Sequence, residues 1–252
     1  MSTDEEIIRK SVNEANIAMS MIREGRINAG VHFWRALVYL DSLKDLRMKR
    51  NELIIISNQL FSRMKFYDLS LFAVQSAIEL DELLQDPRSL VNDMIDYGNI
   101  NVNMGNNDLA LDNYRRVIDI CLGNNDFANA ASASTNLGGI LASMGKMLEA
   151  IPLLNQSIEY LKKAPFPETE INTRLLLINV LYIQKIEPAK VIENAEVLYN
   201  LYADKIQKDS KKMVASALES AIERYLLDHP ELELQAWKKQ KLPMLTYWKS
   251  GY

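Results

Sequence analysis

Small side chains recur every 40 residues along this chain, and that spacing constrains the fold more than any other feature. Two positions of the repeat carry the pattern through four copies. The first position holds Ala18, Asn58, Gly98 and Gly138, and the second holds Gly30, Ser70, Ala110 and Ala150. A fixed period of this length is typical of proteins that stack one supersecondary unit on the next.

The two small positions predict pairs of antiparallel helices, because helices approach closely only where small side chains meet at the crossing point. Gly105 and Gly145 stand between the two positions, where a glycine in the left-handed conformation can end the first helix. Large residues four and eight positions after the second small residue share one helical face and close the pair. They are Trp34, Val74, Tyr114 and Leu154, then Val38, Ile78, Ile118 and Ile158.

The composition favours the same fold class and excludes several functions. Only 9 glycines and 7 prolines occur in 252 residues, whereas sandwiches and barrels need many turn residues. The net charge of -4 argues against a nucleic-acid partner, and no stretch is long and apolar enough to span a membrane. The single cysteine, Cys121, fits a reducing compartment. We therefore expect a cytoplasmic protein with neither nucleic acid nor membrane as a partner.

The pattern resembles that of the tetratricopeptide repeat (TPR) family. The best match comprises Asn136-Leu137-Gly138, Leu141, Gly145, Ala150 and Leu154. The spacing of 40 exceeds the usual period of about 34. It is similar to the long-helix variety of kinesin light chains and of bacterial Rap-type and MalT-type regulators. The resemblance implies an all-α, right-handed α-solenoid with about five repeats and C-terminal capping helices.

We expect one continuous domain over residues 1–252, with repeats at about 3–44, 47–84, 88–123, 126–163 and 167–206. The predicted cap covers 209–241 and the tail 242–252. The helices are predicted at 3–24, 27–44, 47–64, 67–84, 88–104, 107–123, 126–144, 147–163, 167–184, 188–206, 209–227 and 231–241. Prolines at positions 87, 167 and 188 mark three of the helix starts, since proline suits a first turn.

The residues that usually carry catalysis or bind metal are scarce. The histidines are His32 and His229, and we interpret them as a half-exposed helix residue and a helix end. Cys121 is interpreted as a small core residue. No zinc, calcium or phosphate-binding motif occurs, and we find no paired carboxylates in an apolar context that would raise a pKa. We predict that the protein is not an enzyme and has no cofactor or metal.

The TPR resemblance implies a binding groove lined by the first helix of each pair, facing the concave side. Carried over position by position, it predicts contact residues that are mostly amides, which donate and accept hydrogen bonds together. They are Gln59, Arg63, Asn99, Asn103, Asn136, Ser143, Asn179 and Tyr182. The leading hypothesis is a protein- or peptide-binding module acting as an adaptor, assembly factor or regulatory sensor.

The C-terminal tail suggests an alternative function. It combines lysines with Tyr247, Trp248 and Tyr252, and Pro243 rules out one regular helix through it. Such aromatic residues can anchor an interface, so the protein can be a self-associating structural subunit whose tail docks in a neighbour's groove. The other interpretation is that the tail folds back over the last helix. A remote alternative is an enzyme with a cryptic site.

Overall fold

The computed structural model describes residues 3–26, 28–61, 66–229 and 243–250. All regular structure in these ranges is helical, and they contain no strand. The chain divides into two compact units, Met1–Ile120 and Cys121–Tyr252. The predicted all-α solenoid class is confirmed, because within each unit consecutive helices pack on one another in pairs, and successive pairs are in contact through α4 and α5 in the first unit and through α8 and α9 in the second. That the whole chain forms one continuous domain stays a prediction.

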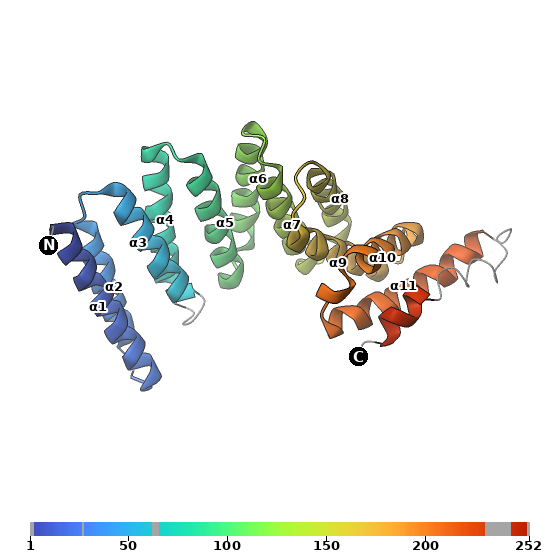
Figure 1. Ribbon diagram of the computed structural model, residues 1–252, viewed down its shortest axis with the longest axis horizontal. Coiled ribbons are helices and arrows are strands. Elements are labelled where there is room, and N and C mark those ends of the chain that lie inside the picture. Colours follow the sequence, from blue (N-terminus) through green and yellow to red (C-terminus); the bar gives the residue numbers. More distant parts are fainter. Residues whose placement is uncertain (1–2, 27, 62–65, 230–242, 251–252) are drawn as a thin grey trace. The chain divides into compact units, whose positions relative to one another are not determined.

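In the first unit, α1 (Thr3–Arg23) packs on α2 (Ala29–Asp41), and α3 (Leu46–Gln59) packs on α4 (Tyr67–Leu84) (Figure 1). The next helix, α5 (Pro87–Met104), contacts α4. Helix α6 (Asn107–Gly123) begins in this unit and continues past its end. We call α1, α3, α5, α7 and α9 the first helices, and α2, α4, α6, α8 and α10 the second helices.

In the second unit, α7 (Phe127–Ser143) packs on α8 (Met147–Lys163), and α9 (Pro167–Gln184) contacts both. Helix α10 (Pro188–Tyr202) packs on α9 and continues into the short 3-10 helix η2 (Ala203–Lys205). The capping helix α11 (Lys208–Asp228) packs on α9 and α10. The helix predicted at 231–241 lies outside the described residues.

Local sequence signals explain where the helices begin and end. Aspartates precede three first helices: the side chains of Asp45, Asp86 and Asp126 each accept a hydrogen bond from a backbone N–H of the following turn. These caps satisfy donors that the helix itself leaves unpaired. At the other end, Gly105 and Gly145 adopt φ of 81° and 78°, as the repeat predicts.

The crossing points of the later pairs confirm the small-residue prediction. A methyl group added at Gly98 would lie 2.7 Å from Cζ of Tyr114, and one at Gly138 would lie 2.9 Å from Cδ2 of Leu154. Ala110 and Ala150 are fully buried, as are Tyr114 and Leu154. A larger side chain at either glycine would therefore force Tyr114 or Leu154 to shift, or the two helices of the pair to move apart.

The predicted register is wrong by one residue in the first pair. Phe33 and Leu37 are buried in the core, whereas Trp34 and Val38, which the period places there, are 47% and 52% exposed. Ala29 takes the crossing position predicted for Gly30. The physical reason is that helix α2 turns the adjacent stripe of its surface toward α1, which packs just as well because that stripe is also apolar.

The second pair shows a similar shift in its first helix. Ser57 is buried and exchanges hydrogen bonds with Ser70 on α4, while Asn58 is exposed. The two hydroxyl oxygens lie 2.9 Å apart. A serine pair satisfies its own polar groups at a close crossing, so the site tolerates serine where other pairs use glycine and alanine.

The C-terminal residues 243–250 form a short helix that begins at Pro243 and lies on the second unit. Trp248 is completely buried there, and the ring of Tyr199 contacts both Tyr247 and Trp248. Tyr247 donates a hydrogen bond to the carbonyl of Ala203, and Lys249 forms an ion pair with Glu219. The tail therefore folds back on its own chain, the second of its two predicted interpretations.

Candidate protein-binding surfaces

Two of the predicted groove residues, Asn99 and Asn103, lie one turn apart on α5 and contact each other. The Asn103 Nδ2 group donates to the backbone oxygen of Asn99 at 2.8 Å, and the Tyr114 hydroxyl donates to Asn99 Oδ1 at 2.7 Å. Gly98 allows the Tyr114 ring to approach this closely. The Asn99 Nδ2 donor and the Asn103 Oδ1 acceptor then have no partner among the described residues.

A hollow lies beside Asn103. It has a volume of about 440 Å³ and is lined by Asn103 and Met104 at the end of α5 and by residues 66–69 at the start of α4. Phe66 and Tyr67 supply aromatic surface, and Asp68 supplies a carboxylate. Asn103 therefore presents a hydrogen-bonding group at the edge of a space large enough for a side chain.

The preceding repeat, α3 and α4, holds two predicted contact residues, Gln59 and Arg63. Gln59 is half-buried at the last position of α3. Arg63 lies outside the described residues. The structure therefore places Gln59 at a helix end, and a role of Gln59 or Arg63 in binding stays a prediction.

In the second unit the predicted contact residues come from α7 and α9. Asn136, Asn179 and Tyr182 are half-buried, and Ser143 is exposed with its hydroxyl donating to the carbonyl of Ile140. Asn136 and Ser143 belong to α7, whereas Asn179 and Tyr182 belong to α9. The two helices are joined by a buried layer of side chains.

That joining layer is a cluster of hydroxyl groups. The Thr135 hydroxyl on α7 lies 2.6 Å from that of Thr173 on α9 and 2.9 Å from that of Ser157 on α8. Ser132 and Thr169 make a second link between α7 and α9 at 3.0 Å. Each buried hydroxyl finds a partner, so the cluster holds the two first helices side by side without unsatisfied polar groups.

The expectation that no carboxylates pair in an apolar setting is wrong. Asp81 on α4 and Asp93 on α5 are each 1% exposed, and Arg50 of α3 donates to both, at 3.0 and 2.6 Å. Burial raises the pKa of Asp93 to about 8, against the lowering effect of Arg50, and also raises the pKa of Asp81. The sequence conceals this pair because its members stand 12 residues apart on different helices.

This acid pair does not resemble an accessible catalytic site. Both carboxyl groups are enclosed, so a substrate has no route to them in this structure. Their role is to join three helices of two successive repeats through one guanidinium group. The signal that could have revealed them is an Asp at position 81 in the apolar stripe of a predicted helix, which demands a buried partner.

The other chemically capable residues lie where the sequence predicts. His32 is half-buried and hydrogen-bonded to Glu14 at 2.7 Å, His229 follows the last residue of α11, and Cys121 is buried.

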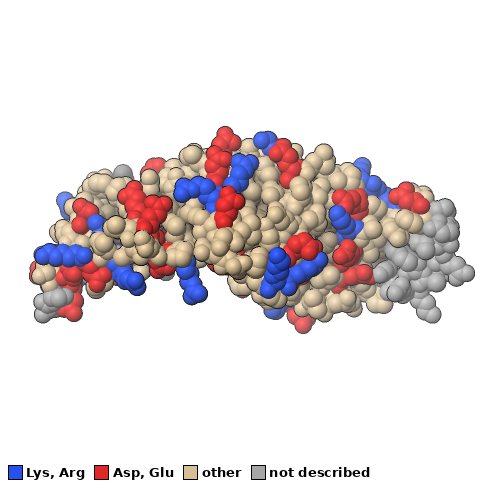
Figure 2. Space-filling view, turned by 90° about the horizontal axis from the view of Figure 1, so that it is seen from above, with Lys and Arg blue, Asp and Glu red and all other residues tan. Residues whose placement is uncertain are grey.

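Among the described residues, no group of three or more potential ligands could hold a metal ion. No helix in the described part of the chain is long and apolar enough to cross a membrane. Figure 2 shows basic and acidic side chains intermixed on the face that it displays.

No protein-family model matches the sequence, and neither does any curated protein. Solved structures do match. Aspartyl phosphate phosphatase F from Bacillus subtilis is 12% identical, with a TM-score of 0.64 over 96% of this chain and 69% of that one. The apo form of RapI is 15% identical, with a TM-score of 0.62 over 96% of this chain and 94% of that one.

A third match comes from a putative kinesin light chain of Podosopora anserina, described as having nearly identical TPR-like repeats. It is 12% identical, with a TM-score of 0.55 over 83% of this chain and 97% of that one. At such low identity these likenesses concern the fold alone. They confirm that the chain has the TPR-like architecture that its sequence resembles.

Proposed function

We propose that this protein is a protein- or peptide-binding module, and that the exposed surface of its first helices makes the contact. The observation that carries the proposal is the Asn99–Asn103 pair. Within the described part of the chain, one amide offers a free donor and the other a free acceptor one helical turn away, and Asn103 lines an aromatic hollow. A peptide backbone requires both a donor and an acceptor, and an adjacent hollow can receive one of its side chains.

The arrangement favours binding over catalysis. At the Asn99–Asn103 site the side chains with free hydrogen-bonding capacity are neutral amides, whereas the paired carboxyl groups of Asp81 and Asp93, whose pKa values are raised, are enclosed. Two of the similar structures are a phosphatase and a set of putative kinesin light chain repeats, so the shared fold does not by itself assign one activity. We infer for this chain the role of an adaptor or regulatory sensor, in the cytoplasm, with a protein or peptide as its partner.

The position of Trp248 disfavours self-association through the tail. Trp248 is fully buried within its own chain, so a neighbour could take it up only after residues 243–250 leave the second unit. Exposing a tryptophan of this size to water is unfavourable. The tail therefore serves as part of the cap in this structure.

A selection of random peptides displayed on phage tests the proposed site. Peptides enriched on the intact protein are synthesised, and their affinity is measured by fluorescence polarisation. We expect the double variant Asn99→Ala, Asn103→Ala to weaken binding by about tenfold or more, since two hydrogen bonds are lost. Asn99 is half-buried and accepts a hydrogen bond from Tyr114, so thermal unfolding of the variant is measured as well, and circular dichroism should show an unchanged helix content.

The matched control is Asn200→Ala, which removes an exposed amide from the second helix α10. It should leave the affinity unchanged. If the double variant binds the selected peptides as tightly as the intact protein does, the first-helix surface of α5 is not the binding site and the proposal fails.

A further inference from the structure

An apolar surface is left uncovered on the second helices α2 and α4, and on α2 it follows from the register shift of the first pair. Trp34 and Val38 of α2 are about half exposed, and so is Val31, which lies one turn before Trp34. Phe72 on α4 is 47% exposed and Leu83 is 67% exposed. Side chains of this size rarely cluster at a surface unless they serve a contact.

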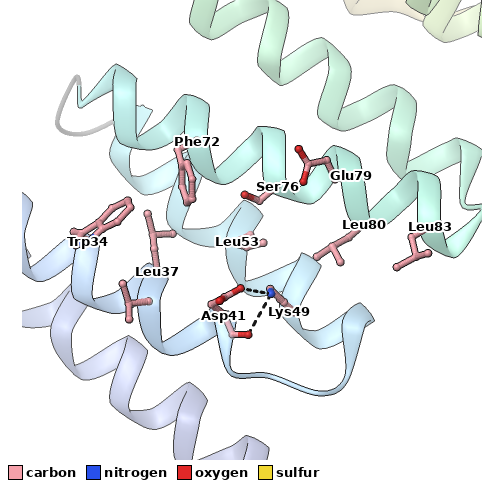
Figure 3. Close-up of a pocket in the computed structure, with 11 residues that line it drawn as sticks. Trp34, Leu37, Asp41, Lys49, Leu53, Phe72, Ser76, Glu79, Leu80 and Leu83 are labelled. Carbon is pink, nitrogen blue, oxygen red and sulfur yellow. Dashed lines mark hydrogen bonds and ion pairs between the residues drawn. The ribbon is translucent and has the colours of Figure 1, made fainter.

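All of these residues except Val31 line a pocket between α2 and α4, with the start of α3 at its base (Figure 3). The pocket has a volume of about 440 Å³. Trp34 and Phe72 face each other across its end, with ring centroids 5.4 Å apart. Leu37, Leu53 and Leu80 add to the apolar lining. We call this feature the α2–α4 groove.

The groove carries a net negative charge at its edge. Lys49 forms an ion pair with Asp41 at 2.7 Å, so the positive charge in the lining is neutralised. Glu79 of α4 is exposed and has no ion-pair or hydrogen-bond partner in the described part of the chain. A partner that places a cation opposite Glu79 would gain an interaction that the protein itself leaves unmade.

The length of the apolar surface indicates the shape of the partner. Phe72 and Leu83 are 11 residues apart on α4, which corresponds to about 16 Å, or three helical turns. Val31, Trp34 and Val38 form a parallel stripe on α2 at the spacing of one helix face. A long, narrow apolar groove of this kind suits a helix better than it suits a compact small molecule.

We propose that the α2–α4 groove binds an amphipathic α-helix of a partner protein. The helix presents apolar side chains at positions i, i+3 or i+4, and i+7, the largest of which enters the pocket beside Trp34 and Phe72. A Lys or Arg next to this apolar stripe lies opposite Glu79. This site is separate from the one proposed above, because it belongs to the second helices α2 and α4, whereas Asn99 and Asn103 belong to the first helix α5.

Designed peptides of about 18 residues provide the probe. The first carries leucines in one helical stripe with lysines elsewhere, the second has the same composition in a shuffled order that breaks the stripe, and the third replaces the lysines with glutamates. Fluorescence polarisation with the full-length protein measures their affinities. We expect the first peptide to bind at least about tenfold more tightly than either of the others.

Two variants connect this binding to the groove. The double variant Trp34→Ala, Phe72→Ala should weaken binding of the first peptide by about tenfold or more, because aromatic anchors dominate such contacts. Glu79→Lys should weaken the lysine peptide and strengthen the glutamate peptide. Glu79 is exposed, so this variant stays folded and keeps the test valid if the aromatic variant does not.

The matched controls remove similar groups elsewhere. Phe166→Ala deletes an aromatic ring that is 45% exposed in the second unit, and Glu82→Lys reverses an exposed charge on α4 outside the pocket lining. Both should bind the first peptide as the intact protein does. Asn99→Ala with Asn103→Ala should also leave this binding unchanged, so the two proposed sites can fail independently.

Three results would overturn the proposal. Equal binding of the ordered and shuffled peptides would show that no helical stripe is recognised. Unchanged binding in both Trp34→Ala, Phe72→Ala and Glu79→Lys would place the peptide elsewhere. If the dye 1-anilinonaphthalene-8-sulfonate binds in the groove, as judged by its loss in the aromatic variant, and the first peptide does not displace it, the groove is a small-molecule site.

Discussion

Asp81 and Asp93 face the same guanidinium group from successive helices, and each retains one buried oxygen, Oδ2, that has no hydrogen-bond partner among the residues that the structure describes. Two buried carboxylates beside a single Arg50 would leave one negative charge uncompensated. A proton held by the pair removes that charge and can satisfy one of the free oxygens. This arrangement explains why burial raises the pKa of both acids.

The first prediction concerns pH. The pKa of Asp93 is about 8 in the folded protein and about 3.9 in an unfolded chain. Its contribution to stability is therefore complete below about pH 4 and is lost as the pH rises toward 8. Relative to Asp93→Asn, which stays neutral, the intact protein should lose about 1 kcal/mol of unfolding free energy per pH unit between pH 5 and 8.

Urea unfolding of both proteins at several pH values measures this difference. Asp112→Asn serves as the control, because Asp112 is exposed and pairs with Arg115 at the surface. It should follow the pH dependence of the intact protein. Parallel stability curves for the intact protein and Asp93→Asn would contradict a proton held by the acid pair.

The second prediction compares two neighbouring glycines of α7. A methyl group at Gly138 would lie 2.9 and 3.0 Å from Leu154 atoms, whereas one at Gly139 would make an ordinary contact of 3.5 Å with Leu176. Both substitutions to alanine gain the same helix propensity, about 1 kcal/mol. Overpacking of about 1–3 kcal/mol should outweigh or cancel that gain at Gly138 alone.

Thermal unfolding followed by circular dichroism should give a lower midpoint for Gly138→Ala than for Gly139→Ala. Since both positions belong to one helix, the difference isolates packing at the α7–α8 crossing. Equal midpoints would mean that Leu154 moves aside without cost, and that the small residue at this position of the repeat is not required by packing.

The third prediction concerns the tail. Trp248→Ala should lower the unfolding free energy by about 3–5 kcal/mol, as expected for truncating a fully buried aromatic side chain. Lys249→Ala breaks an exposed ion pair with Glu219 and should cost less than about 1 kcal/mol. Light scattering should give the same mass for both variants and the intact protein. A mass that falls by half on the Trp248 substitution alone would instead support docking of the tail in a neighbour.

The fourth prediction uses Cys121 to detect local unfolding of helix α6. Burial raises the pKa of its thiol to about 12, so at pH 8 the reactive thiolate is almost absent in the folded protein. A disulfide reagent should modify this cysteine slowly in buffer and rapidly in denaturant. Fast modification of the folded protein would show that the helix α6 opens locally without global unfolding.

Much of the fold follows from residues close together in the sequence. The glycines at 105 and 145, the aspartates at 86 and 126 and the prolines at 87, 167 and 188 act within one turn of their own helix. Their effect depends on the local backbone alone, which is why the predicted helix boundaries agree with the structure within a few residues over most of the described chain.

The site was predicted less completely. Placing Asn99 and Asn103 on one face of a first helix needed only the helical period, and the structure brings them together. The period could not show that the Tyr114 hydroxyl donates to the Asn99 side-chain oxygen, or that a hollow lies beside Asn103. Both features depend on side chains from helices that the pattern places only approximately.

The sequence by itself therefore determined the helices, their ends and their pairing, because each of these depends on neighbouring residues or on a period that repeats. Only the tertiary structure decided which of two adjacent apolar stripes of α2 is buried, and so left Trp34 exposed instead of Phe33. It also decided that Arg50, Asp81 and Asp93 meet in the interior. The physical reason is that the rotation of a helix about its axis is set by the shape of its neighbours, and a helix with two apolar stripes does not specify that rotation alone.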